Sequence, residues 1–175
     1  MKKISVKQVK ALIMAVVMVF AMNVGITKAL ALGNAGTGWY LPAGSGKAAL
    51  ISISDKKINK SSLSIGPSLK IDGKTHKVTV IKKNAFKGAK AKTISLPKTV
   101  TKIEKQAFNG EKCKKTLTVK IRSTKLKKSS VKGCFKGAKA KKIVVKVPKK
   151  KLKAYKKIFT KKNTGAKGKV VVKAL

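Results

Sequence analysis

The sequence FKGAKAK at Phe86–Lys92 occurs again, without change, at Phe135–Lys141. A shorter copy lies between them, because AFNG at Ala107–Gly110 matches AFKG at Ala85–Gly88, and an isoleucine stands four residues before both alanines. The three phenylalanines of these copies are 22 and 27 residues apart. Self-similarity at a period of this size is typical of stacked repeat units. The sequence therefore predicts an array of about three units.

Each copy is followed by a short stretch in which apolar and polar residues alternate: Thr93–Leu96, Leu117–Ile121 and Ile143–Val147. A period of two predicts a strand with one buried face. One strand and one phenylalanine form too small a core for a unit to fold alone, so neighbouring units must stack. The residues that we expect in this shared core are Phe86, Ile94, Leu96, Phe108, Leu117, Val119, Ile121, Phe135, Val145 and Val147.

The segment Ile81–Ile103 resembles the repeat of BspA-type leucine-rich-repeat proteins of bacterial surfaces. It carries Ala-Phe-x-Gly at Ala85–Gly88 and Pro-x-x-Val-x-x-Ile at Pro97–Ile103. The resemblance extends over roughly residues 65–175. It departs in the middle copy, which has no proline after its strand and an insertion around Glu111–Lys115, and in Cys134, which replaces alanine. The resemblance implies a secreted or surface-associated protein that binds partners through its exposed strand face.

These observations together predict a β-rich α/β fold, a short leucine-rich-repeat-like solenoid of about three repeats. The expected segments are a signal peptide (1–31), a flexible Gly-rich leader (32–49), an N-terminal β-hairpin and capping segment (50–80), the repeat array (81–148) and a C-terminal helix-plus-strand cap (149–175). Asp72-Gly73 is a type I′ hairpin signal, because both positions tolerate positive φ. Leu152, Tyr155 and Phe159 have helical spacing, and Val170–Val172 provides the last strand.

The first 31 residues have the three parts of a secretory signal peptide. Four lysines precede an uncharged stretch at residues 11–26, and Ala29-Leu30-Ala31 gives the small-x-small pattern before a cleavage site. The alternative is an uncleaved membrane anchor, for which this stretch is short of the roughly 20 residues that span a bilayer. Cleavage would remove five lysines and no acids, lower the formal charge from +41 to +36, and leave no transmembrane segment.

The chain is extremely basic, with 45 Lys or Arg residues against 4 Asp or Glu among 175 residues. Acid–base catalysis, paired-carboxylate hydrolysis and oxygen-ligand metal sites all need Asp, Glu or His, so we predict a protein that is not an enzyme and uses no cofactor or metal. Only one cation, Arg122, is an arginine. Lysine lacks the bidentate fork that reads bases, which argues against sequence-specific nucleic-acid binding.

Three residues could in principle carry other chemistry. Cys113 and Cys134 could form a disulfide after export or remain two packed thiols, and their spacing does not decide between these. His76 shares strand parity with Val78 and Val80, which predicts a half-buried ring. A hydrolase built on Cys134 and His76 would lack an orienting acid near either residue.

Aligning the strands at Leu96, Ile121 and Val147 predicts a shared outward face. Its residues are Thr93, Ser95, Thr118, Lys120, Val144 and Lys146. They form either a ligand face or an ordinary solvated strand surface. Two functions follow: binding or adhesion to a protein, a glycan or an anionic cell-wall polymer through this face, or polyanion and membrane binding by a repeat scaffold that only displays lysines. Attraction to polyanions should in both cases weaken with salt.

Overall fold

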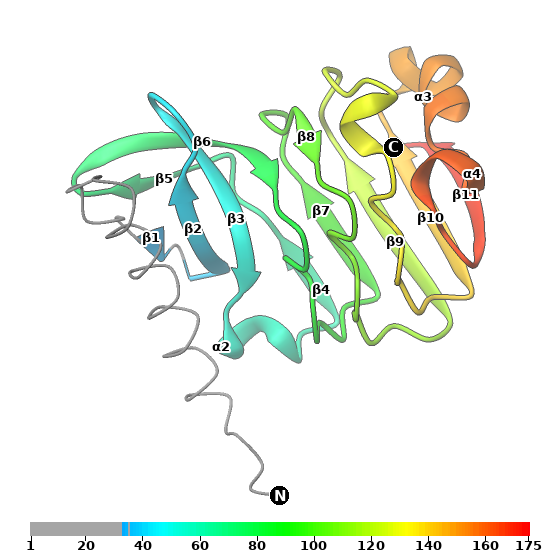
Figure 1. The fold of residues 1–175 in the computed structure, drawn as a ribbon, viewed down its shortest axis with the longest axis horizontal. Helices are drawn as coiled ribbons and strands as arrows, with labels where there is room; N and C mark the ends of the chain where they lie inside the picture. The colour runs from blue at the N-terminus through cyan, green and yellow to red at the C-terminus, as the bar shows by residue number, and fades with distance from the viewer. Residues whose placement is uncertain (1–32, 35) are drawn as a thin grey trace, which may run out of the picture. The chain divides into compact units, whose positions relative to one another are not determined.

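The computed structural model describes residues 33–34 and 36–175. The predicted signal peptide, residues 1–31, lies outside the described residues. Five parallel strands form one sheet in the order β11-β10-β9-β7-β4 (Figure 1). Their bounds are β4 Ser62–Ser64, β7 Thr93–Leu96, β9 Thr116–Ile121, β10 Lys142–Val147 and β11 Lys169–Ala174. Each strand after β4 is one unit further along the chain, as stacked repeats require.

A second, mixed sheet has the order β1-β2-β3-β6-β5, with β8 paired to β6. Its strands are β1 Gly33–Asn34, β2 Gly38–Pro42, β3 Lys47–Ile53, β5 Ser68–Ile71, β6 Lys74–Ile81 and β8 Lys102–Ile103. The pairs β3–β6 and β6–β8 are parallel, whereas β1–β2, β2–β3 and β5–β6 are antiparallel. The parallel pairs in this sheet therefore follow the same unit-to-unit progression as the first sheet.

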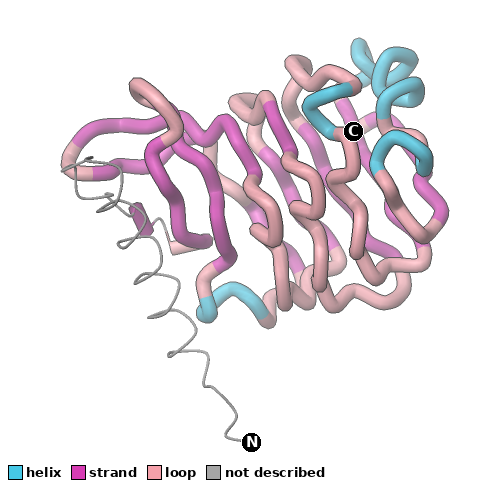
Figure 2. The backbone as a smooth tube through the Cα atoms, viewed as in Figure 1, coloured by secondary structure: helices cyan, strands magenta, loops and turns pink. Residues whose placement is uncertain are grey.

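The predicted hairpin and helix are both present. Strands β5 and β6 are joined by Asp72 and Gly73, whose φ angles of 49° and 73° are both positive. The helical segments are short (Figure 2): α2 Asp55–Ile58, the 3₁₀ turns Ser129–Val131 and Lys149–Lys151, α3 Leu152–Ile158 and α4 Lys161–Thr164. Gly165 ends α4 with φ of 67°, the left-handed conformation that favours glycine at a helix end.

Backbone hydrogen bonds connect the Ala-Phe turn of each unit to that of the next. They run from Ile53 N–H to Ala85 O (3.0 Å), Phe86 N–H to Ala107 O (3.1 Å), Phe108 N–H to Cys134 O (3.3 Å) and Phe135 N–H to Thr164 O (2.9 Å). The ladder therefore extends beyond the three copies visible in the sequence. At its first step a residue of β3 takes the turn position, and at its last step a residue of α4 does.

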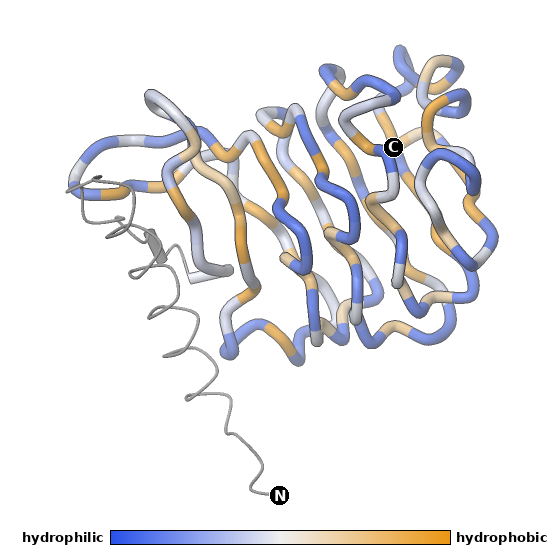
Figure 3. The backbone as a smooth tube through the Cα atoms, in the orientation of Figure 1, coloured by the Kyte–Doolittle hydropathy of each residue, from blue (hydrophilic) through white to orange (hydrophobic). Residues whose placement is uncertain are grey.

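The phenylalanines of these turns stack on one another inside the molecule. Ring centroids are 4.7 Å apart for Phe86 and Phe108 and 4.9 Å apart for Phe108 and Phe135. Phe159 continues the column 6.5 Å from Phe135. All ten residues expected in the core are 0% exposed. Hydrophobic and hydrophilic stretches alternate along both the strands and the connections (Figure 3). Stacking buries the hydrophobic surface that each unit would expose alone.

The segment expected to be a loosely packed Gly-rich leader, residues 32–49, instead contributes strands. It contains β2 and the start of β3, which pair with each other in antiparallel register. The side chain of Tyr40 is 1% exposed. Glycine content alone indicated flexibility, but Gly38 has a packing reason: a Cβ there would overlap Ser52 O and lie 2.8 Å from a Leu50 methyl carbon. This glycine permits close approach of neighbouring backbones.

Burial raises the pKa of Tyr40 to about 12, above the value of about 10 expected in the unfolded chain. Folding therefore favours the neutral phenol. The resulting contribution to the free energy of unfolding is fully present below pH 10 and is lost as the pH rises toward 12. A pKa difference of about 2 corresponds to about 2.7 kcal/mol. We expect the free energy of unfolding to fall by most of this amount relative to the Tyr40→Phe variant between pH 9 and pH 12, measured by urea denaturation. A constant difference between the two proteins would contradict this.

Candidate binding face

The outward side chains of the five parallel strands form rows across the sheet. Ser95 pairs with Lys120 and Lys120 with Lys146, while Thr93 pairs with Thr118 and Thr118 with Val144. The structure thus brings all six residues of the expected face together. The inward residues of β7, β9 and β10 are buried, as alternation of side chains across a strand requires.

The two rows are longer than the sequence indicated. Strand β4 adds Ser62 and Ser64 at one edge, and β11 adds Val171 and Lys173 at the other. A third row contains Thr116, Lys142 and Lys169. The last three strands consequently carry five outward lysines, which we call the sheet-face lysines: Lys120, Lys142, Lys146, Lys169 and Lys173.

One residue of the expected face is not freely accessible. Val144 is only 9% exposed, whereas Thr93, Ser95, Thr118, Lys120 and Lys146 are half-buried. Val144 lies between Thr118 and Val171 in its row, and lysines flank it at outward positions of its own strand. Long lysine stems cover apolar surface while keeping the ammonium group in water. Val144 therefore forms the floor of this face rather than a contact point.

No Asp or Glu occurs in the sequences of these five strands. Neighbouring strands in a sheet are about 4.8 Å apart, so Lys120, Lys146 and Lys173 follow one another at short intervals. Like charges directly opposite in a sheet are destabilising. The face therefore has uncompensated positive charge in a regular arrangement, and an anion placed across the strands would relieve the repulsion.

Glu111 is the only buried acid among the described residues, and backbone N–H groups surround its carboxylate. Its side chain is 1% exposed, and its carboxylate accepts hydrogen bonds from the backbone N–H groups of Cys113 (2.5 Å), Lys139 (2.7 Å) and Ala140 (3.0 Å). Burial raises the pKa of Glu111, and these three N–H groups and the charge of Lys139 oppose the rise. The carboxylate thus connects the insertion of the middle repeat to the following turn through hydrogen bonds.

The two cysteines are buried and the histidine is half-buried. Cys113 and Cys134 are both free and buried, so the disulfide left open by the sequence is not formed. Burial raises the pKa of both thiols, which keeps them as weak nucleophiles at neutral pH. His76 is half-buried, with Nδ1 2.9 Å from the carbonyl oxygen of Lys74. Its position on β6 is the one that strand parity indicated.

The turn ladder and the parallel sheet are the geometry of a leucine-rich-repeat array. The family model for the BspA-type leucine-rich-repeat region matches residues 51–164 in six copies. The chain belongs to this family. The match begins and ends close to Ile53 and Thr164, the first and last residues of the backbone ladder. The expected count of about three repeats, taken from the two FKGAKAK copies and the shorter copy at Ala107–Gly110, is lower than the six copies of the family match.

No curated protein and no solved structure matches the chain. BspA-type repeat proteins are typically bacterial surface or secreted proteins and typically not enzymes. Across residues 33–34 and 36–175, no helix is long and apolar enough to cross a membrane. Within the same residues, no three or more His, Cys, Asp or Glu side chains are grouped so that they could hold a metal ion.

Proposed function

We propose that this BspA-type protein is secreted or held at the bacterial surface, where it binds an anionic wall polymer or glycan through the outer face of the β4-β7-β9-β10-β11 sheet, without catalysis. The observation that supports this is the regular placement of the sheet-face lysines on three neighbouring strands. A signal peptide at residues 1–31 would bring the protein to such polymers with a formal charge of +36.

The ends of the sheet suit a short binding module. We assign the α3–α4–β11 segment as the C-terminal cap of the array. The β5–β6 hairpin, expected within the N-terminal capping segment, follows β3, which holds the first residue of the turn ladder. Phe159, which follows α3, stacks on the last repeat phenylalanine, and Thr164 of α4 accepts the last hydrogen bond of the turn ladder. Terminal capping units keep the core of a solenoid away from water.

The proposal is tested with two variants of equal charge. The sheet-face variant changes Lys120, Lys146 and Lys173 to glutamine. The hairpin variant changes the exposed Lys70, Lys74 and Lys77 of β5 and β6 to glutamine. Binding to poly(glycerol phosphate), to sulfated glycans and to extracellular-matrix proteins is measured at low and high salt. We expect the sheet-face variant to bind its polyanion at least about tenfold more weakly, because three charge contacts are lost, and the hairpin variant to change little.

Equal weakening in both variants would contradict the proposal. That result would favour the other function considered for this chain, a scaffold that displays lysines on all sides. Most lysines do lie outside the strands of this sheet, such as those at residues 87–92, 136–141 and 149–157. Tight binding of an uncharged ligand that is unaffected by either variant would also contradict it.

A further inference from the structure

Four lysines occupy the same position in four successive turns. Lys83, Lys105 and Lys132 each stand two residues before the residue that begins the Phe turn (Ala85, Ala107 and Cys134), and Lys162 stands two residues before Thr164. We call these four the turn lysines. All are exposed, and they come from the loop after β6, the loop after β8, the loop after the Ser129–Val131 turn, and α4.

The backbone holds these positions in register. The residue after each lysine is bonded to its equivalent in the next turn: Asn84 N–H to Gln106 O (3.0 Å), Gln106 N–H to Gly133 O (2.8 Å), and Gly133 N–H to Asn163 O (2.8 Å). Asn84, Gln106 and Gly133 all have positive φ, between 61° and 67°, so three of the four turns share one local conformation. Hydrogen-bonded neighbouring backbones are about 4.8 Å apart, so the four Cα positions span about 14 Å.

The turn lysines all line one groove of about 540 Å³. Its other polar walls come from Ser129 and Asn163, and Lys102 of β8 adds a fifth ammonium group. The stem of Lys105 crosses the next turn at Gly133, where an added Cβ would lie 2.9 Å from the Lys105 Cγ. Gly133 thus leaves room for the lysine above it. The groove belongs to the turns and β8, and is separate from the outer face of the parallel sheet.

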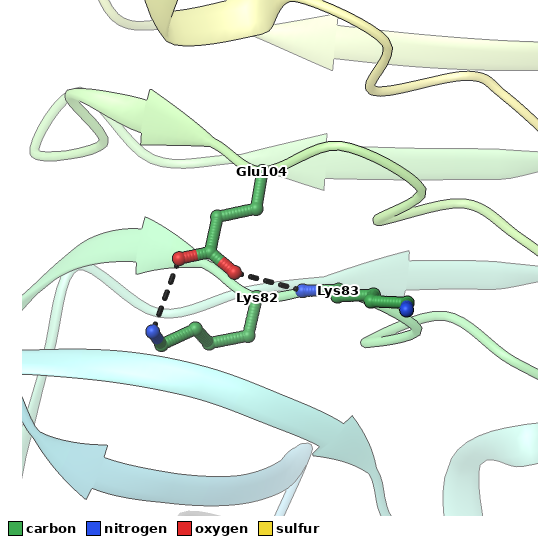
Figure 4. Close-up of polar contacts among 3 residues, drawn as sticks. All are labelled: Lys82, Lys83 and Glu104. Atoms are coloured by element: carbon green, nitrogen blue, oxygen red, sulfur yellow. Dashed lines mark hydrogen bonds and ion pairs between the residues drawn. The ribbon is translucent and has the colours of Figure 1, made fainter.

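Glu104 is the only acidic residue that lines this groove, and its carboxylate is turned toward the preceding unit. It accepts from Lys82 Nζ at 3.0 Å and from the backbone N–H of Lys83 at 3.2 Å (Figure 4). Its charge is therefore offset by Lys82, which is not part of the groove wall. Five lysines remain against one acid that already has a partner.

We propose that this groove is a second binding site, for a linear chain of phosphate groups that lies along the turn lysines. Lysine is a compact point charge with rotatable donors, which suits phosphate groups presented at variable angles. A single phosphate can meet only part of a row of four ammonium groups about 14 Å long. A chain that carries several phosphates can neutralise the whole row and release several counterions.

The test uses inorganic tripolyphosphate and orthophosphate as probes, with the purified protein, in isothermal titration calorimetry at constant ionic strength. Poly(glycerol phosphate) is titrated as well, to distinguish whether the groove binds a phosphoanhydride chain or a phosphodiester chain. The turn variant changes Lys105, Lys132 and Lys162 to glutamine. We expect it to bind tripolyphosphate at least about tenfold more weakly, and the sheet-face and hairpin variants to remain within about threefold of the unmodified protein.

A gain of affinity provides an independent arm. Glu104→Gln removes the acid from the groove, and we expect tripolyphosphate to bind about two- to fivefold more tightly. The proposal is overturned if the turn, sheet-face and hairpin variants lose the same affinity, or if tripolyphosphate binds no better than orthophosphate. Weaker binding of poly(glycerol phosphate) by the sheet-face variant, together with unchanged binding of tripolyphosphate by the turn variant, would support the first site and contradict this one, so the two proposals fail separately.

Discussion

Replacing Phe108 with alanine is expected to lower the free energy of unfolding by about 3–5 kcal/mol, the range for truncating a buried phenylalanine. Phe108 is 0% exposed and lies in the middle of the column, with ring neighbours on both sides at 4.7 and 4.9 Å. Its loss leaves a cavity between two units and removes the aromatic contacts of both neighbours. Urea denaturation followed by circular dichroism measures the effect.

Phe108→Leu is the matched control, because it keeps an apolar side chain in the column. We expect it to cost about 1.5 kcal/mol, the upper end for hydrophobic replacements of similar volume. A cost below about 1 kcal/mol for the alanine variant would mean that the units do not depend on this stack, and would contradict the account of the core.

Glu111→Ala is expected to destabilise the protein by at least about 3 kcal/mol, because three backbone N–H groups lose their acceptor and each unsatisfied buried donor costs about 1–3 kcal/mol. The expectation is specific, because alanine is the residue that Ala89 and Ala138 provide at the same position of the other units. Repeat similarity alone would predict that this change is harmless. Thermal and urea unfolding measure the change in stability and so distinguish these two expectations.

The matched control is Glu104→Ala, which removes the acid of a partly exposed ion pair with Lys82. Such pairs contribute roughly 0–1 kcal/mol, so a small loss is expected. If Glu111→Ala proves as mild as Glu104→Ala, the carboxylate does not hold the insertion in place and the middle repeat closes without it.

The residues of the repeat core could be predicted from the sequence, because the sequence patterns that mark them are local and recur in each unit. Ala-Phe-x-Gly, the alternating strand and the proline after it fix which residues of each unit face inward, and stacking identical units aligns them. This is why the expected row from Ser95 through Lys120 to Lys146 agrees with the observed register. The Asp72-Gly73 turn was predictable for the same reason.

The parts that sequence reasoning missed depend on distant contacts. Pairing of β2 with β3, and of β3 with β6, joins segments that share no repeat signature, so residues 32–49 were interpreted from their glycines alone. The hydrogen bonds of Glu111 to Lys139 and Ala140 cross to another unit. The turn lysines did have a visible signal, since a lysine stands two residues before Ala85, Ala107 and Cys134.

The most direct test of the proposed function is the salt dependence of binding to the polyanion that the screen identifies, measured for the purified protein and its sheet-face variant. Plotted as log K against log salt concentration, the slope should be strongly negative, and the variant's slope should be shallower by about 2, since each phosphate contact on a single-stranded polyanion contributes about 0.7. The hairpin variant should keep the slope of the unmodified protein. Binding that persists unchanged from low to molar salt, or the same slope in all three proteins, would contradict recognition by the lysines of this face.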